Sequence, residues 1–150
     1  STLPQGVREA VSRRLSRLSD ETSTALAAAA VVGSHFALDL VERVTGDDLI
    51  DAFDEARRAG IVIEEPGGLY RFNHALVRQS LLAELASVRR MRLHQRIAVT
   101  LEAESGADDE LLAELAYHYF ECAWAGNAAK AVEYCRRAAD QAMPAPGRGP

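Results

Sequence analysis

Two cysteines and the absence of a long apolar run limit where this 150-residue chain can work. Cys122 and Cys135 are too few for a disulfide framework, and both occur among alanines in helical patterns. We expect small buried thiols in a reducing compartment. The longest apolar stretch, Ala25 to Val32, is far shorter than the roughly 20 apolar residues that cross a bilayer. With no signal-peptide pattern either, we expect a cytoplasmic protein with no membrane contact.

Motifs for catalysis, nucleotide binding and zinc binding are missing as well. The chain has no G-x-x-x-x-G-K-[ST] loop to hold a triphosphate and no Cys/His set with zinc-ligand spacing. It also has no G-x-S-x-G or H-E-x-x-H motif, and its histidines fall in four different predicted elements. We therefore expect no enzymatic activity, metal or cofactor within this chain.

Lysine is almost absent, and the basic charge of the chain is nearly all arginine. Residues 1–100 hold 13 arginines and 13 acidic residues, whereas residues 101–150 hold 4 basic and 9 acidic residues. The net charge of −5 therefore arises entirely in the last third. Because nucleic-acid binding normally requires a concentrated basic surface, this distribution argues against a nucleic-acid partner.

Two short alternating segments predict a β-hairpin in an otherwise helical chain. Residues 61–65 and 69–72 alternate in polarity, and Pro66–Gly68 between them is a strong turn signal. Apolar residues at helical spacing predict helices at 7–18, 19–32, 38–44, 47–59, 74–86, 88–104, 111–125 and 128–143. His35 and Phe36, between two helices, suit a short extended segment. The fold class is mainly α, and a hairpin after short helices is the plan of a winged helix.

The predicted elements group into a winged-helix domain at residues 1–86 and a helical arm at 87–143. Residues 144–150, rich in proline and glycine, are expected to be a disordered linker or tail. Within the arm, the two last helices resemble a tetratricopeptide-type (TPR-like) hairpin in their small and large residues: Leu115, Ala116, Tyr119, Ala131, Cys135 and Ala138. One such hairpin buries little by itself, so we expect the chain to be part of a longer protein.

The helix predicted at 47–59 occupies the position that enters the major groove in DNA-binding winged helices. Its acidic residues outnumber its two arginines, Arg57 and Arg58, and the wing adds Glu64 and Glu65. Because acidic groups repel phosphates, we expect no direct binding of nucleic acid by this surface. An autonomous DNA-binding winged helix is the less favoured alternative.

Four arginines form the most basic local stretch: Arg89, Arg90, Arg92 and Arg96. The common interpretation of such a stretch is a solvated helix face that pairs with neighbouring acids. The functional interpretation is a docking face for another domain or for a phosphate.

The residue that follows the wing is a second candidate. Asn73 is expected to cap a helix that carries His74 and Arg78 in its first two turns. His74 could hold the wing by a hydrogen bond, or its ring could contact a nucleotide phosphate held by a neighbouring domain, because helix N-termini attract anions. Arg78, one turn later, could assist His74 or pair with an acid such as Glu55 or Glu65.

The order of these features resembles the winged-helix and helical-arm regions of STAND-type signalling ATPases, especially large LuxR-type transcriptional regulators. The similar residues are 3–11, Arg14, Leu15, Leu18, Ser19, 28–33, Phe36, Leu49, Ala52, 59–62, 70–78, 92–98 and 113–118. In that group the wing is followed by Met-His-Asp, whose histidine touches the β-phosphate of ADP and holds the off state. His74 matches this histidine, but Asn73 and Ala75 replace its neighbours.

The resemblance implies partners outside this chain. An adjacent upstream ATPase domain would bind ATP or ADP, further helical repeats would follow, and a separate DNA-binding domain would occur elsewhere in the parent. The chain itself would be a non-catalytic regulatory module that couples the nucleotide state of the ATPase domain to a helical-repeat sensor arm. The other alternative is a TPR-like scaffold that binds a partner protein.

Overall fold

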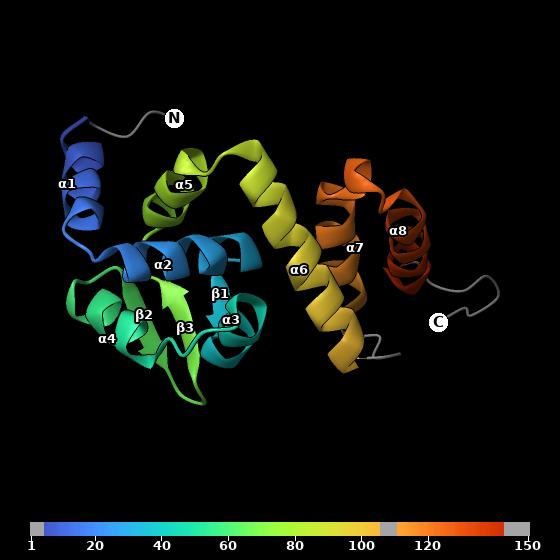
Figure 1. Ribbon diagram of the computed structural model, residues 1–150, viewed down its shortest axis with the longest axis horizontal. Helices are drawn as coiled ribbons and strands as arrows, with labels where there is room; N and C mark the ends of the chain where they lie inside the picture. Colours follow the sequence, from blue (N-terminus) through green and yellow to red (C-terminus); the bar gives the residue numbers. More distant parts are fainter. Residues whose placement is uncertain (1–4, 106–110, 143–150) are drawn as a thin grey trace, which may run out of the picture. The chain divides into compact units, whose positions relative to one another are not determined.

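The computed structural model describes residues 5–105 and 111–142 (Figure 1). The expected tail at 144–150 lies outside the described residues. Contacts divide the chain into two compact units, Ser1–Arg90 and Met91–Pro150. The boundary falls inside one long helix, and each unit is considered separately below. None of the described helices combines the length and apolar composition needed to cross a bilayer.

The first unit contains the sheet and most of the short helices. Its elements are α1 (Gln5–Ser16), α2 (Asp20–Val32), β1 (His35–Ala37), α3 (Leu38–Thr45), α4 (Ile50–Arg58), β2 (Val62–Glu65), β3 (Leu69–Phe72) and α5 (Ala75–Glu84). The long helix α6 (Ser87–Ser105) leads into the second unit, which continues with α7 (Leu112–Glu121), the short 3-10 helix η2 (Ala123–Ala125) and α8 (Ala128–Ala142). The predicted fold class, mainly α with one short hairpin, is confirmed.

The sheet has three antiparallel strands in the order β1-β3-β2. The hairpin predicted from Pro66–Gly68 forms as expected, with Gly67 and Gly68 at φ values of +84° and +75°. Residues with a side chain rarely adopt this left-handed backbone conformation, so the tight turn favours glycine at both positions. The extended segment at His35 becomes β1, which pairs with β3 and places Phe36 opposite Tyr70. The order α2-β1-α3-α4-β2-β3 is that of a winged helix.

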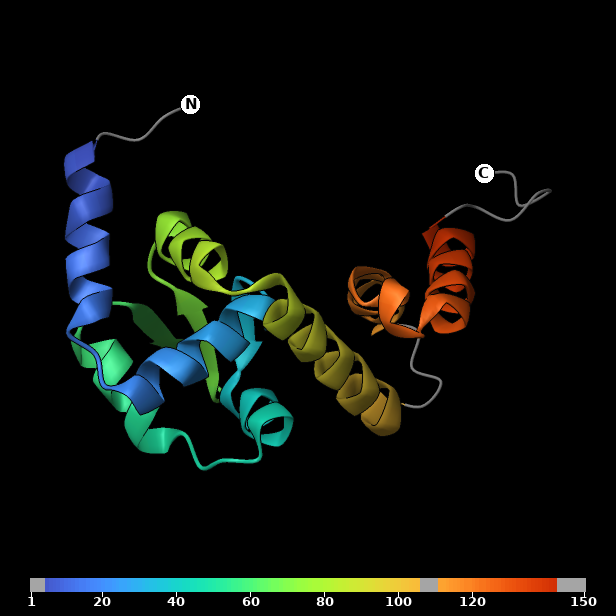
Figure 2. The same ribbon diagram turned by 45° about the horizontal axis from the view of Figure 1, so that its top comes forward.

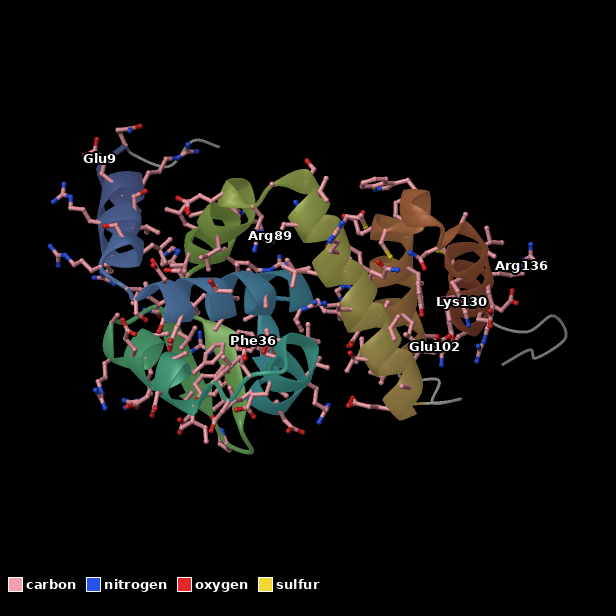
Figure 3. All side chains as sticks on the ribbon, viewed as in Figure 1. Glu9, Phe36, Arg89, Glu102, Lys130 and Arg136 are labelled. Atoms are coloured by element: carbon pink, nitrogen blue, oxygen red, sulfur yellow. The ribbon has the colours of Figure 1, made fainter. Side chains whose placement is uncertain are left out.

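A cluster of aromatic rings forms the core between the sheet and the helices. Phe36, whose place is marked in Figure 3, lies at a centroid distance of 5.4 Å from Phe53 and 5.3 Å from Phe72. Tyr70 completes the cluster at 5.4 Å from Phe53. In Figures 1 and 2, α2 lies between α5 and the sheet, and its alanines allow close packing on both sides. Burial of these rings provides much of the stability of the unit.

One carboxylate of α4 completes the N-terminus of α2. The Ser19 hydroxyl accepts a hydrogen bond from the Thr22 amide at 3.2 Å and so caps α2. Glu55 accepts bonds from the Ser19 amide at 3.0 Å and from the Thr22 hydroxyl at 2.6 Å. The Thr22 bond, followed by the bonds from Ser19, lowers the pKa of Glu55. The side chain therefore fixes α4 against the start of α2.

Helix α4 begins later than the predicted start at Asp47 or Asp48. Its first helical residue is Ile50, and the preceding amide, that of Leu49, donates to a carboxylate oxygen of Glu42 at 2.9 Å. Asp48 accepts instead from the amide of Ile50, at 3.2 Å. The start of α4 is therefore held partly by a side chain of α3, a contact that helical spacing does not indicate.

In the second unit, Glu102 of α6 joins three helices. It accepts hydrogen bonds from the Tyr119 hydroxyl of α7 and the Lys130 ammonium of α8, both at 2.8 Å, and from the Tyr134 hydroxyl of α8. Figure 3 labels Glu102 and Lys130 on their helices. Burial alone would raise the pKa of Glu102, but the three hydrogen bonds lower it on balance.

The helix pair that was predicted to resemble a TPR-type hairpin corresponds to α7 and α8. Its expected core residues Leu115, Ala116, Tyr119 and Ala131 are buried, as is Cys122. The expectation that Cys135 is buried was wrong, because this residue is exposed. Its neighbour Tyr134 is buried instead, with its ring stacked on that of Tyr119 at 5.6 Å. The Tyr134 hydroxyl reaches Glu102, which allows the large ring to occupy the core position.

Candidate functional site

His74 lies directly behind the wing, between the end of β3 and the start of α5. It is the N-cap residue, with extended backbone angles of φ −147° and ψ 140°, and its side chain is exposed. The amide of Val77 donates to its carbonyl oxygen at 3.0 Å, which begins the helix. The ring is thus carried at a helix N-terminus, where the partial positive charge of the backbone attracts anions.

The prediction that Asn73 caps α5 was wrong. Its side-chain amide donates to the carbonyl oxygen of Gly60 at 2.9 Å, and its backbone amide donates to Ile61 at 3.0 Å. Asn73 therefore fastens the end of the wing to the turn after α4. No side chain caps α5, and its first turn contains no acidic residue.

Arg78 reaches a backbone carbonyl rather than an acidic side chain. Its Nε atom donates to the carbonyl oxygen of Ala30 at 2.8 Å, near the C-terminal end of α2. A cation is favourable there because the last carbonyls of a helix carry partial negative charge. The expected alternative of a pair with Glu55 or Glu65 was wrong: Glu55 binds the start of α2, and Glu65 lies 3.4 Å from Nε of Arg71.

The predicted arginine stretch does not form one uniform face. Arg89, Arg92 and Arg96 recur at helical spacing on α6, and all three are exposed. Arg90 is rotated about the helix axis by roughly a quarter turn from Arg89 and is half-buried. A docking role therefore involves three of the four arginines, and it stays a prediction.

The surface of α4 carries little free positive charge. Asp54 binds Arg57 at 2.7 Å and also pairs with Arg58. The hydrogen bond from Arg57 lowers the pKa of Asp54, so both partners stay charged near neutral pH. The exposed neighbours Asp51 and Ile50 add one negative charge and one apolar side chain. Such a surface would repel a phosphate backbone.

The structure brings together two histidines that the sequence left in separate elements. His94 of α6 and His118 of α7 are 1% and 2% exposed, and their Nδ1 atoms lie 2.8 Å apart. The sequence contains a signal for the burial of each ring. His94 lies on the apolar stripe that contains Met91, Ala98 and Leu101, and His118 follows Leu115 by three residues and precedes Cys122 by four. Spacing shows that both rings face a core, but not that they face each other.

Known proteins provide no comparison for this arrangement. A scan against protein-family models, a search of curated proteins and a search of solved structures each found no match. Within residues 5–105 and 111–142, no group of three or more histidine, cysteine or acidic side chains is placed to hold a metal ion.

Proposed function

We propose that the chain is a non-catalytic regulatory module of a cytoplasmic STAND-type ATPase transcriptional regulator. In this role it couples the nucleotide state of an adjacent ATPase domain to a helical-repeat sensor arm. The proposal rests on the resemblance described above and on one observation, the exposed His74 ring at the uncapped N-terminus of α5. A phosphate held by the neighbouring domain would find a ring N–H and backbone amides at this point.

The coupling would act as a population shift. ADP, with its β-phosphate against His74, would favour a closed form, and ATP with an inducer would favour an open one. The attachments of Asn73 to Gly60 and of Arg78 to Ala30 support this proposal. They hold the start of α5 rigidly against the turn after α4 and the end of α2, so that a displacement at His74 would be passed to the whole unit.

The test is His74→Ala in the intact parent protein, with His35→Ala as a matched control. His35 is also exposed and lies in the same unit, on β1. We expect His74→Ala to weaken ADP binding and to raise basal transcriptional output, and His35→Ala to change neither. ADP affinity and basal output both unchanged in His74→Ala would reject the sensor role.

A second candidate function, a scaffold that binds a partner protein, is favoured by an aromatic face on α7 and η2. Tyr117, Phe120 and Trp124 recur at helical spacing and are exposed, the last two by 63% and 67%. Exposed aromatic groups of this size commonly mark interaction sites. Pull-downs with and without nucleotide, comparing Phe120→Ser with Val132→Ser on α8, separate this function from the first. Capture that depends on Phe120 but not on nucleotide would favour the scaffold.

A further inference from the structure

The buried histidine pair has a property that follows from its hydrogen bond. His94 and His118 face each other through the same kind of atom, Nδ1, over 2.8 Å. Such a contact needs one donor and one acceptor, so one ring must carry its proton on Nδ1 and the other on Nε2. The two neutral rings must therefore be opposite tautomers.

Protonation changes this contact in two distinct steps. The closed pair can hold a first proton, because a charged ring can still donate a hydrogen bond to a neutral one. The carboxylate of Glu121, with an oxygen 3.9 Å from Nε2 of His94, favours this charge. A second proton would place two N–H groups head to head and two positive charges within 3 Å in a buried position. Since no orientation of the rings satisfies both donors, the second proton can bind only after the rings separate.

We propose that the His94–His118 pair is a pH-sensitive latch between α6 and α7, closed at neutral pH and opened by mild acid. The ordinary pKa of imidazole is about 6.5, so separated rings take up protons below neutrality and the closed pair loses stability from there. Most carboxylates titrate at lower pH, but burial raises the pKa of Glu114, so this group can add to the histidine titration at the acid end of the window. The latch requires no nucleotide and acts on the arm itself.

The charged groups around the pair favour one positive charge and oppose two. Glu121 supports the first proton, and the ring of Tyr117 lies edge-on to His94 at 5.5 Å. Arg90 precedes His94 by one turn on α6, and Glu114 precedes His118 by one turn on α7. From α8, Lys130 is directed to Glu102.

Opening of the latch would leave the hydrogen bond between Glu102 and Tyr119 as one contact that still joins α6 to α7. That bond is unaffected by the titration of histidine, because the lowered pKa of Glu102 keeps it charged throughout the window. The expected result of mild acid is therefore a loosened but still attached α7.

The test is urea unfolding of the full chain between pH 7.5 and 5.5, followed by the fluorescence of Trp124. This is the chain's one tryptophan, it lies in η2 directly after α7, and it reports on the second unit. As the pH falls, we expect the unfolding equilibrium constant to rise by up to about tenfold per pH unit for each proton that unfolding takes up. Imidazole nitrogen chemical shifts at pH 7.5 should show opposite tautomers for the two rings.

Two variants complete the test. The His94→Leu/His118→Leu double variant keeps the burial and removes both histidines, so its unfolding should lose most of the pH dependence in this window. Should that variant fail to fold, His118→Gln provides an amide partner that does not titrate, and it should reduce the dependence. The control His35→Gln should keep the wild-type dependence. A wild-type protein with no pH dependence between 7.5 and 5.5, or variants that retain all of it, would overturn the latch.

Discussion

Arg78 donates a hydrogen bond from Nε to the carbonyl oxygen of Ala30, and this bond joins α5 to the C-terminal end of α2. The contact spans 48 residues of sequence. From the sequence, Arg78 was expected to assist His74 at a phosphate or to pair with an acidic side chain. The structure shows instead that its guanidinium group binds a backbone carbonyl. A phosphate contact by the same guanidinium group stays a prediction.

Replacing Arg78 by methionine should destabilise the first unit. The variant keeps most of the aliphatic stem but leaves the Ala30 carbonyl without its charged donor, which should cost about 1.5 kcal/mol. Arg8→Met, on the exposed surface of α1, should stay within about 0.5 kcal/mol of the wild type. Urea denaturation measures both. Equal stabilities for the two variants would show that the bond contributes nothing.

Phe53 and Ile50 on α4 provide a matched test of the aromatic core. Phe53 is fully buried against Phe36 and Tyr70, whereas Ile50 is 61% exposed one turn earlier. Phe53→Ala should lower the free energy of unfolding by about 3–5 kcal/mol, because it removes ring contacts and leaves a cavity. Ile50→Ala should change it by less than about 0.5 kcal/mol. Thermal unfolding followed by circular dichroism distinguishes the two.

Glu55 should make the first unit sensitive to acid. Its hydrogen bonds with Thr22 and Ser19 lower its pKa in the folded chain below the ordinary value of 4.5. The stabilisation is therefore complete above pH 4.5 and is lost as the pH falls through the lowered folded value. Glu55→Gln should lower the Tm at pH 7 and flatten this acid-dependent loss. Asp51→Asn on the same helix should do neither, and thermal melts from pH 7 to pH 3 test both.

Glu102→Gln should weaken the second unit more than any change of a surface carboxylate on α8. The amide removes the negative charge of the carboxylate that accepts three hydrogen bonds, and the free energy of unfolding should fall by about 2 kcal/mol. Glu133→Gln breaks only an exposed pair with Arg137 and should cost less than about 0.5 kcal/mol. Because the folded pKa of Glu102 is lowered, its contribution is present above pH 4.5 and fades in acid. Trp124 fluorescence during urea unfolding measures both variants.

The acidic surface of α4 should prevent the isolated chain from binding DNA. A fluorescence titration against random duplex at low salt should show no binding in the micromolar range, because Asp54 already occupies Arg57 and Arg58. Micromolar or tighter binding with a steep salt dependence would instead support the alternative of an autonomous DNA-binding domain.

Much of the fold is encoded in local patterns that can be read from the sequence. The turn at Pro66–Gly68 and the helical spacing of apolar residues each predicted elements that form. These signals depend only on residues a few positions apart, so they do not require knowledge of the tertiary structure.

The features that local patterns missed depend on side-chain contacts between different elements. The start of α4 is set partly by Glu42, and Asn73 turns away from α5 to bind Gly60. Likewise, the sequence placed His94 and His118 in separate elements, and only the tertiary structure makes them partners. At Cys135 a small thiol suggested burial, yet the neighbouring Tyr134 occupies the core because Glu102 satisfies its hydroxyl.

The carboxylate of Glu102 receives donors from α7 and α8 while belonging to α6. Because these three helices meet at one carboxylate, they should not unfold locally one at a time. The release of any one of them would weaken the hydrogen bonds that hold the other two. Backbone amides near Glu102, Tyr119 and Tyr134 should therefore exchange with deuterium at a common rate, as a single cooperative opening unit.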